Sequence, residues 1–159
     1  EGASVLKNPY FKNLGLKVTK GEVIEFFSSD LDLNQITHSG VITIPMDKSM
    51  YYAGSTFDWN DLSFEKTKKA KNEIIEKIQK LKNFTYKIIK QKASIRPSTK
   101  DRRPIIGSHK NYNNLYIMNG LGSRGILLSP YLANQLCLNI FEDKSIDAEI
   151  DVNRFNYTY

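Results

Sequence analysis

The sequence has 159 residues, of which 40% are hydrophobic and 25% charged, with a formal net charge of +6. These values are typical of one globular domain, so we predict a single domain over residues 1–159. No apolar run approaches the roughly 18 residues of a membrane span, which argues against a membrane partner. The lone cysteine, Cys137, excludes a disulfide within the chain and favours a reducing, cytoplasmic location.

The positive charge gathers on one segment, residues 65–82, whose lysines are Lys66, Lys68, Lys69, Lys71, Lys77, Lys80 and Lys82. Glu65, Glu73 and Glu76 lie between them. Interleaved charge of this kind is typical of a solvated helix face, and it disfavours a nucleic-acid partner. A basic surface nevertheless attracts phosphate. The alternative function is therefore a noncatalytic basic module that binds RNA or an acidic partner.

Hydrophobic periodicity predicts most elements of the first hundred residues. Residues 5–16 are expected to form a loop or short helical turn, and the alternation over 17–27 predicts a strand. The stretches 41–45 and 50–57 flank a turn and predict an antiparallel hairpin. An apolar stripe over 65–82 predicts a helix, with Asp61 or Ser63 as its N-cap. A strand over 86–95 then leads to Arg96.

The C-terminal third contains a short strand at 115–118 and a helix over 125–141 that is apolar on nearly every face. A helix of this composition is expected to be buried between layers, with Cys137 as a small buried hydrophobe. Residues 148–159 are expected to be a tail with a frayed end. The predicted fold class is α+β, a mostly antiparallel mixed sheet with helices packed against it.

Two loops carry the chemistry that the sequence suggests. Residues 96–107 place an arginine where the chain turns at two prolines, and residues 119–130 form a glycine-rich turn that opens directly into a helix. A fixed guanidinium and a helix N-terminus both hold anions. The plainer alternatives are a structural ion pair between Arg96 and Asp101, and an ordinary glycine-rich connection. His38 and His109 are solitary and in polar surroundings, so neither predicts a metal site.

The order of these motifs resembles the C-terminal part of the FAD-dependent amino-acid and amine oxidoreductases of the D-amino-acid oxidase and glycine oxidase type. Members carry Arg-Pro-x-[Ser/Thr]-x-Asp running into Pro-x-Ile-Gly, found here at 96–107. A short strand and a glycine loop before a Leu-rich helix follow at 115–140. Upstream, Lys20-Gly21-Glu22, the strand at 40–45 and Tyr52-Ala53-Gly54-Ser55-Thr56 are similar to family strands. The resemblance covers roughly residues 1–155.

The resemblance implies FAD as cofactor and a small-molecule amine or amino acid as substrate. It implies a substrate-domain sheet and helix over 17–118, and a flavin-facing loop with its buried helix over 119–142. Arg96 would bind a substrate carboxylate, and Tyr52 and Trp59 would line the cavity. The residues expected to face the flavin are Gly120, Leu121, Gly122, Ser123, Arg124, Gly125 and Ile126.

Family members begin with a strand, a Gly-x-Gly-x-x-Gly loop and a helix that bind the FAD pyrophosphate, and we predict that no such pattern, with its glycine spacing, occurs in this chain. The chain is then expected to be a fragment, inactive alone, whose partner is the missing N-terminal FAD-binding domain. The sequence leaves open whether the protein forms a homo-oligomer. Some amino-acid-oxidising members also carry a tyrosine on the strand at 40–45. This chain has none there, which argues against glycine or a D-amino acid as substrate.

Overall fold

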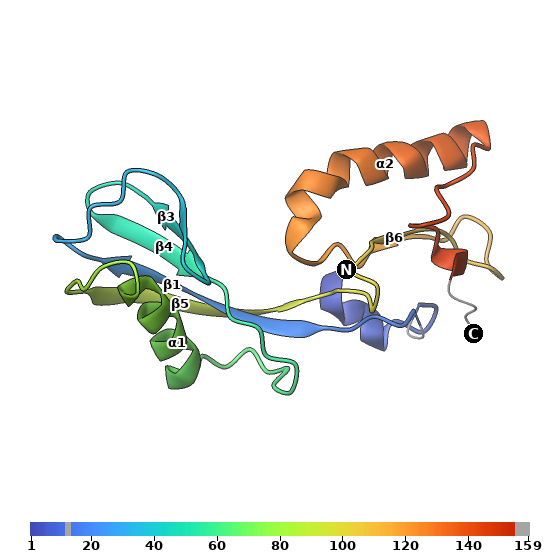
Figure 1. Cartoon of the computed structure of the whole chain (residues 1–159). Coiled ribbons are helices and arrows are strands. Elements are labelled where there is room, and N and C mark those ends of the chain that lie inside the picture. Colours follow the sequence, from blue (N-terminus) through green and yellow to red (C-terminus); the bar gives the residue numbers. More distant parts are fainter. Residues whose placement is uncertain (12–13, 155–159) are drawn as a thin grey trace. The chain divides into compact units, whose positions relative to one another are not determined.

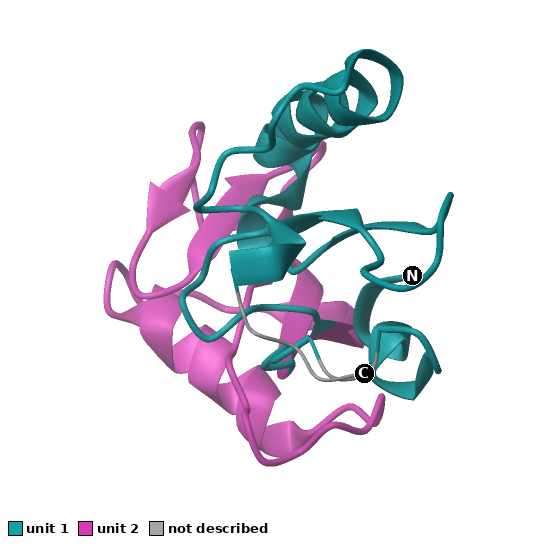
Figure 2. Ribbon diagram, turned by 90° about the vertical axis from the view of Figure 1, so that its right-hand side faces the viewer, with its two compact units in different colours: residues 1–18, 96–159 teal, residues 19–95 magenta. Residues whose placement is uncertain are grey.

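The computed structural model describes residues 1–11 and 14–154. Their contacts divide the chain into two compact units, coloured separately in Figure 2. Unit 1 comprises residues 1–18 and 96–159, and unit 2 comprises residues 19–95. The single domain over 1–159 stays a prediction.

Unit 2 is built on a five-stranded sheet. Its strands are β1 (Thr19–Phe27), β2 (Thr37–His38), β3 (Ile42–Pro45), β4 (Met50–Gly54) and β5 (Lys87–Arg96), in the order β2-β3-β4-β1-β5. β4 pairs antiparallel with both β3 and β1, so the predicted hairpin is confirmed. Alternating side chains of β1 and β4 point into the core on one face of the sheet, namely Ile24, Phe26, Tyr51 and Ala53.

Helix α1 (Lys68–Gln79) covers the apolar face of this sheet. Its buried stripe consists of Ala70, Ile74, Ile75 and Ile78, the spacing that an amphipathic helix requires. The predicted N-cap was wrong, because Thr67 takes that place and its Oγ1 accepts the N–H of Ala70 at 3.1 Å. Asp61 and Ser63 are instead bonded to Lys20.

Unit 1 contains the hairpin of β6 (Ile105–Ser108) and β7 (Tyr116–Asn119), which pair antiparallel. Three 3₁₀ helices, η1 (Gly2–Lys7), η2 (Gly122–Arg124) and η3 (Val152–Arg154), and helix α2 (Gly125–Glu142) complete it (Figure 1). Together with the antiparallel sheet of unit 2, these elements confirm the α+β fold class. The core around the hairpin is formed by Val5, Phe11, Leu14, Ile105, Ile117 and Val152.

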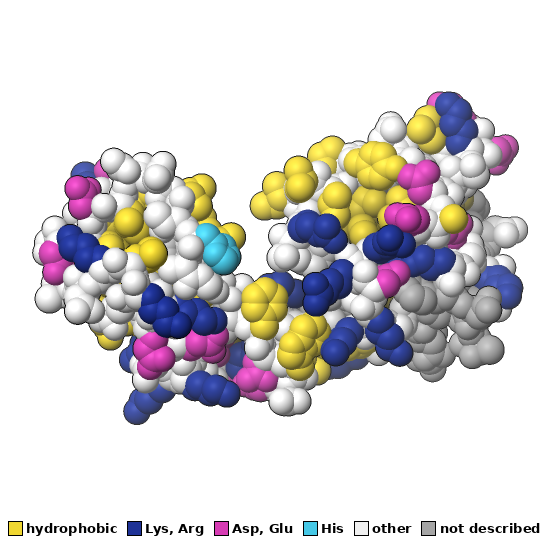
Figure 3. Space-filling view, viewed as in Figure 1, with side chains coloured by type: hydrophobic (Ala, Val, Ile, Leu, Met, Phe, Trp, Pro, Cys, Tyr) yellow, Lys and Arg dark blue, Asp and Glu magenta, His cyan; other side chains and the backbone are white. Residues whose placement is uncertain are grey.

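The prediction that α2 is buried all round was wrong. Its one buried residue is Leu132, which packs with Leu128 and Leu136 toward Ile106 of β6. On the opposite side Ile126, Leu127 and Phe141 are 97%, 77% and 81% exposed, and a yellow apolar surface covers α2 in Figure 3. Cys137 is exposed as well. A helix that is apolar on nearly every face is expected to pack against other elements on two sides, but in unit 1 only the Leu132 side of α2 is packed.

The predicted C-terminal tail was also partly wrong. Ile150 and Val152 are buried, and the N–H of Ile106 donates to the Ile150 carbonyl at 2.9 Å. The chain therefore returns to β6 before residue 154, while the expected frayed end at 155–159 lies outside the described residues. No helix in the described ranges is long and apolar enough to cross a membrane.

Candidate functional site: a glycine loop at the start of α2

The two loops singled out by the sequence lie against each other in unit 1. The N–H of Gly122 donates to the carbonyl of Pro97 at 2.9 Å, and Ser98 and Leu121 form an isolated antiparallel bridge. On its other side, the Ser98 carbonyl accepts the N–H of Lys17 at 2.6 Å. The segment that follows Arg96 is thus held between residue 17 and the glycine loop.

Two glycines of the loop have a backbone that only glycine adopts freely. Gly120 has φ +72°, and a Cβ there would lie 2.8 Å from Cγ2 of Thr99. Gly122 has φ +57°, and its Cβ would lie 3.3 Å from Oγ of Ser98. Left-handed backbone without side chains lets a ligand approach the peptide groups closely.

The loop ends at the N-terminus of α2, which has an open, electropositive end. No side chain caps this helix, and its first turn contains no acidic residue. The guanidinium of Arg124 donates to the Arg102 carbonyl at 2.8 Å, which ties the helix start to the loop after Arg96. Helix N–H groups that no side chain or acid occupies favour a negatively charged ligand.

Arg96 is half-buried at the end of β5, immediately before Pro97. Its alternative partner, Asp101, is engaged by another arginine. Nε and Nη2 of Arg154 donate to the two carboxylate oxygens of Asp101 at 3.1 and 3.2 Å. Burial raises the pKa of Asp101, but the bonds from Arg154 and from the Arg103 N–H outweigh it and hold the pKa below its usual value.

The other two predicted substrate residues, Tyr52 and Trp59, belong to unit 2. Tyr51 is buried and its hydroxyl donates to the Leu31 carbonyl, whereas Tyr52 on the opposite face is half-buried. Adjacent strand residues alternate in this way, as predicted. Trp59 lies beyond β4 in the connector to α1 and is 48% exposed.

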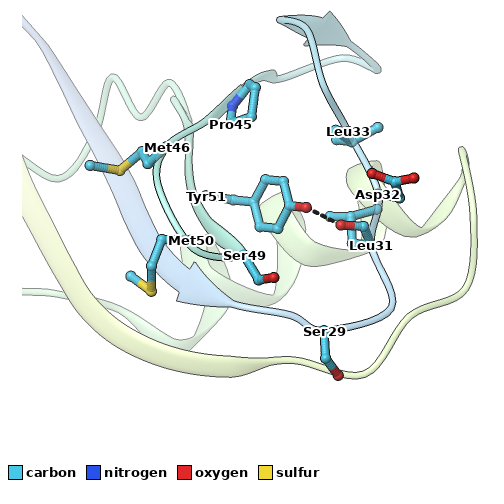
Figure 4. A pocket seen from close by; sticks show the side chains of 9 residues that line it. All are labelled: Ser29, Leu31, Asp32, Leu33, Pro45, Met46, Ser49, Met50 and Tyr51. Carbon is cyan, nitrogen blue, oxygen red and sulfur yellow. Dashed lines mark hydrogen bonds between the residues drawn. The ribbon is translucent and has the colours of Figure 1, made fainter.

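A pocket of about 380 Å³ lies in unit 2 beside the turn between β3 and β4. Figure 4 shows Tyr51 at its centre with Met46 and Met50 to one side and Leu31, Asp32 and Leu33 to the other. Tyr52 and Trp59 are not among its lining residues. The pocket is therefore separate from the predicted substrate residues.

The relatives of this sequence identify its family. The family described as FAD dependent oxidoreductase (DAO) matches residues 3–137. The chain belongs to this family. Its glycine loop and the Arg96 segment lie within the matched range, and their roles in binding stay predictions.

Curated relatives of this DAO-family chain include two bacterial proteins. One is the tRNA 5-methylaminomethyl-2-thiouridine biosynthesis bifunctional protein MnmC of Marinobacter nauticus, 26% identical over 86% of this chain and 24% of the relative. The other is the glycine oxidase of Bacillus subtilis, 27% identical over 80% of this chain and 37% of the relative. The chain thus spans well under half the length of these relatives.

Solved structures share the fold of this DAO-family chain. Glycine oxidase from Geobacillus kaustophilus superposes with a TM-score of 0.74 at 21% identity, over 93% of this chain and 42% of that one. L-proline dehydrogenase from P. horikoshii gives a TM-score of 0.71 at 18% identity, over 90% and 41%. The predicted fold and family are confirmed.

One signal in the glycine loop escaped the sequence analysis. Gly120, Gly122 and Gly125 have the Gly-x-Gly-x-x-Gly spacing and stand between a strand and a helix. In pyrophosphate-binding loops this spacing follows a strand of a parallel sheet. Here β7 pairs antiparallel with β6, so the spacing occurs in a different context. The prediction that the spacing is absent was wrong.

The residues present fit the ring end of FAD. The left-handed glycines leave room for close approach, and the uncapped start of α2 favours an anionic group. Those features suit the part of a flavin that gains negative charge on reduction. For the described residues, no group of three or more His, Cys, Asp or Glu could hold a metal ion.

His109 is a structural residue that the sequence analysis misplaced. It is only 4% exposed, and its ring lies among those of Tyr10, Phe11 and Tyr112. Its Nδ1 accepts the N–H of Asn111 at 3.0 Å, which leaves Nε2 to donate to the Tyr10 carbonyl at 3.1 Å. The aromatic residues around positions 10 and 112 were the available signal.

Proposed function

We propose that this chain forms the substrate side and the flavin-facing loop of an FAD-dependent oxidoreductase that oxidises a C–N bond of an amino acid or secondary amine. FAD, when bound, would supply the chemistry by accepting a hydride from the carbon next to nitrogen. The observation that carries the proposal is the glycine loop bonded to the Arg96 segment and opening into an uncapped helix.

The glycine loop has one task in this proposal. The first turn of α2 would face the flavin and stabilise its negative charge, while Gly120 and Gly122, without side chains, would leave room for the ring. Leu121, Ser123, Arg124 and Ile126 complete the loop. Because the Gly122–Pro97 bond fixes the loop, the N–H groups of the first turn of α2 need little rearrangement when the charge develops.

Arg96 would bind the substrate carboxylate. A guanidinium fork makes two parallel charge-assisted bonds, which fix both the position and the angle of the substrate. Arg96 immediately precedes Pro97, whose carbonyl is bonded to Gly122 of the glycine loop. A substrate bound by Arg96 would therefore lie near the group that the loop binds. Tyr52 and Trp59 are proposed to limit which side chains or amines enter. Relatives named glycine oxidase and iminodiacetate oxidase support the amino-acid class.

The dinucleotide-binding portion of the fold is the proposed partner of unit 1. Solved relatives are about two and a half times as long as the part that this chain matches. The exposed apolar side chains of α2 are the surface that such a portion would cover. We therefore expect the 159-residue chain alone to bind little FAD and to show no turnover.

The test uses the intact protein that contains this chain, as wild type and with Arg96→Ala. We expect a yellow protein with a flavin absorbance spectrum. The variant should keep its flavin but lose about a hundredfold or more in kcat/KM for carboxylated amines, because the two-bond clamp is lost. Arg96→Lys should recover little, since a lysine has no planar fork.

Arg103→Ala is the matched control, because Arg103 pairs with Glu149 at the surface at 3.3 Å. It should leave both flavin content and kcat/KM unchanged. A colourless intact protein would contradict the oxidoreductase function itself. Equal activity of the Arg96 variant on carboxylated amines would contradict only the role given to Arg96.

A further inference from the structure

The connector between β4 and α1 presents aromatic side chains outward. Within residues 55–67, Phe57, Trp59 and Phe64 are 62%, 48% and 70% exposed. In Figure 1 this connector is the blue-green to green loop that leaves β4 and reaches α1. Three large exposed rings within eight residues are unusual for a loop, because apolar side chains normally hold a loop to its core.

The connector is instead fixed by its polar groups, which turn inward. Lys20 of β1 is only 1% exposed, and its Nζ donates to Asp61 at 2.5 Å and to Ser63 at 3.2 Å. The buried carboxylate of Glu22 accepts the N–H and the hydroxyl of Thr67 at 3.0 and 2.8 Å. Backbone bonds between Lys20 and Asp58 add to this. The rings are thus held outward on an ordered backbone.

The positive charge of the chain lies directly after these rings. Residues 65–92 contain ten lysines and three glutamates, a net of +7, whereas the whole chain carries +6. The remainder of the chain is therefore close to neutral. Of the three interleaved acids, Glu73 is paired with Lys77 at 2.6 Å. In the described part of the chain, no ion pair involves Lys66, Lys68, Lys69, Lys71 or Lys80.

The rings and the lysines are close in space as well as in sequence. Lys20 and Glu22, two residues apart on β1, hold Asp61 of the connector and Thr67 at the start of α1. The connector and the first turn of α1, which contains Lys68 and Lys69, are therefore fixed at the same part of β1. Exposed rings beside unpaired lysines match a polymer with stackable faces and a phosphate backbone.

We infer that this surface, the connector rings with the lysines of α1, binds single-stranded RNA. Bases would stack on Phe64 and its neighbouring rings, and phosphates would pair with Lys66, Lys68 and Lys69. A partner held by charge alone would contact only the lysines, whereas a single strand would contact the lysines with its phosphates and the rings with its bases. The inference involves neither Arg96 nor the glycine loop, and its test changes Phe64 and not Trp59, the one ring that the proposed redox function also uses.

The experiment measures fluorescence anisotropy of a labelled 15-nucleotide oligouridylate with the 159-residue chain at several salt concentrations. We expect saturable binding that weakens with salt. Phe64→Ala should weaken binding about tenfold without changing the salt dependence, because it removes stacking. The double variant Lys68→Ala/Lys69→Ala should lower the slope of log K against log salt by about 1.4, the value for two phosphate contacts on a single strand.

The matched controls lie in unit 1. Phe141→Ala removes a phenyl ring that is also largely exposed, and Lys100→Ala/Lys110→Ala removes the same charge from exposed positions. Both should bind like wild type. The inference is overturned if oligouridylate does not bind at low salt, or if the control variants weaken binding as much. It is also overturned if polyglutamate competes as well as RNA of equal charge, since the partner would then be an acidic protein.

Discussion

Two glycines of the same loop in unit 1 differ in whether another residue could replace them. Gly120 must be a glycine for two reasons, its left-handed backbone and the closeness of Thr99. Gly125, five residues later, has φ −55°, and its Cβ would make an ordinary 3.6 Å contact with Leu121. The same residue type is thus essential at one end of the loop and replaceable at the other.

Gly120→Ala should lower the free energy of unfolding of the chain by about 1–3 kcal/mol, because alanine is strained at positive φ and its methyl group meets Thr99. Gly125→Ala should change the free energy by less than about 1 kcal/mol, since the position is helical. Urea denaturation followed by circular dichroism measures both. Equal losses would show that the backbone at residue 120 is not left-handed.

At the scale of elements, one of the bonds that hold the connector before α1 to β1 is an ion pair. Lys20 bonds to the Asp61 carboxylate, and this bond, followed by those from Ser63, lowers the Asp61 pKa to about 2. A carboxylate with a lowered pKa in the folded state adds stability above its unfolded pKa near 3.9, and the contribution is lost as the pH falls toward 2.

Asp61→Asn should therefore be less stable than wild type at pH 6, and the two should converge as the pH approaches 2. The comparison is the unfolding midpoint in urea across this pH range. Asp47→Asn is the control, because Asp47 lies exposed in the β3–β4 turn, and it should follow the wild type throughout. A constant difference between Asp61→Asn and wild type would rule out the ion pair as its cause.

The sequence predicted the elements well where periodicity decides them. The alternation of β1 and β5 and the stripe of α1 are local patterns, and the structure has them within a few residues. Three features depend instead on contacts with residues far away in the sequence. They are the N-cap at Thr67, the burial of His109 and the return of Ile150 to β6. No local pattern contains that information. For the glycine loop, motif order identified the family, while residue spacing alone did not.

The molecule as a whole has one apolar surface that unit 1 leaves open. Leu128, Leu132 and Leu136 fix α2 to the hairpin, whereas Ile126, Leu127 and Phe141 point away from it. Exposed apolar side chains in such number usually mark a contact with another part of a protein. The side of α2 that was wrongly predicted to be buried within this chain is thus the side that the proposed dinucleotide-binding portion would cover.

The 159-residue chain alone should bind the hydrophobic dye ANS and self-associate with rising concentration. The double variant Leu127→Ser/Phe141→Ser should reduce dye fluorescence to roughly half and shift the chain toward monomer, because it removes two of the largest exposed apolar groups. Sedimentation velocity measures the second effect. Leu132→Ser should act in the opposite way, since that side chain is 1% exposed and its change opens the core.

Arg154 has a consequence for how this protein can be handled. Its guanidinium also donates to the carbonyls of Pro104 and Arg103, at 3.0 Å each, besides binding Asp101. The shape of the loop after Arg96 is thus set by a side chain more than fifty residues later. A tag fused close to residue 154, or a deletion of η3, would act as a site mutation. Expression designs should leave residues 150–154 untouched, even though they lie far from every predicted ligand contact in the sequence.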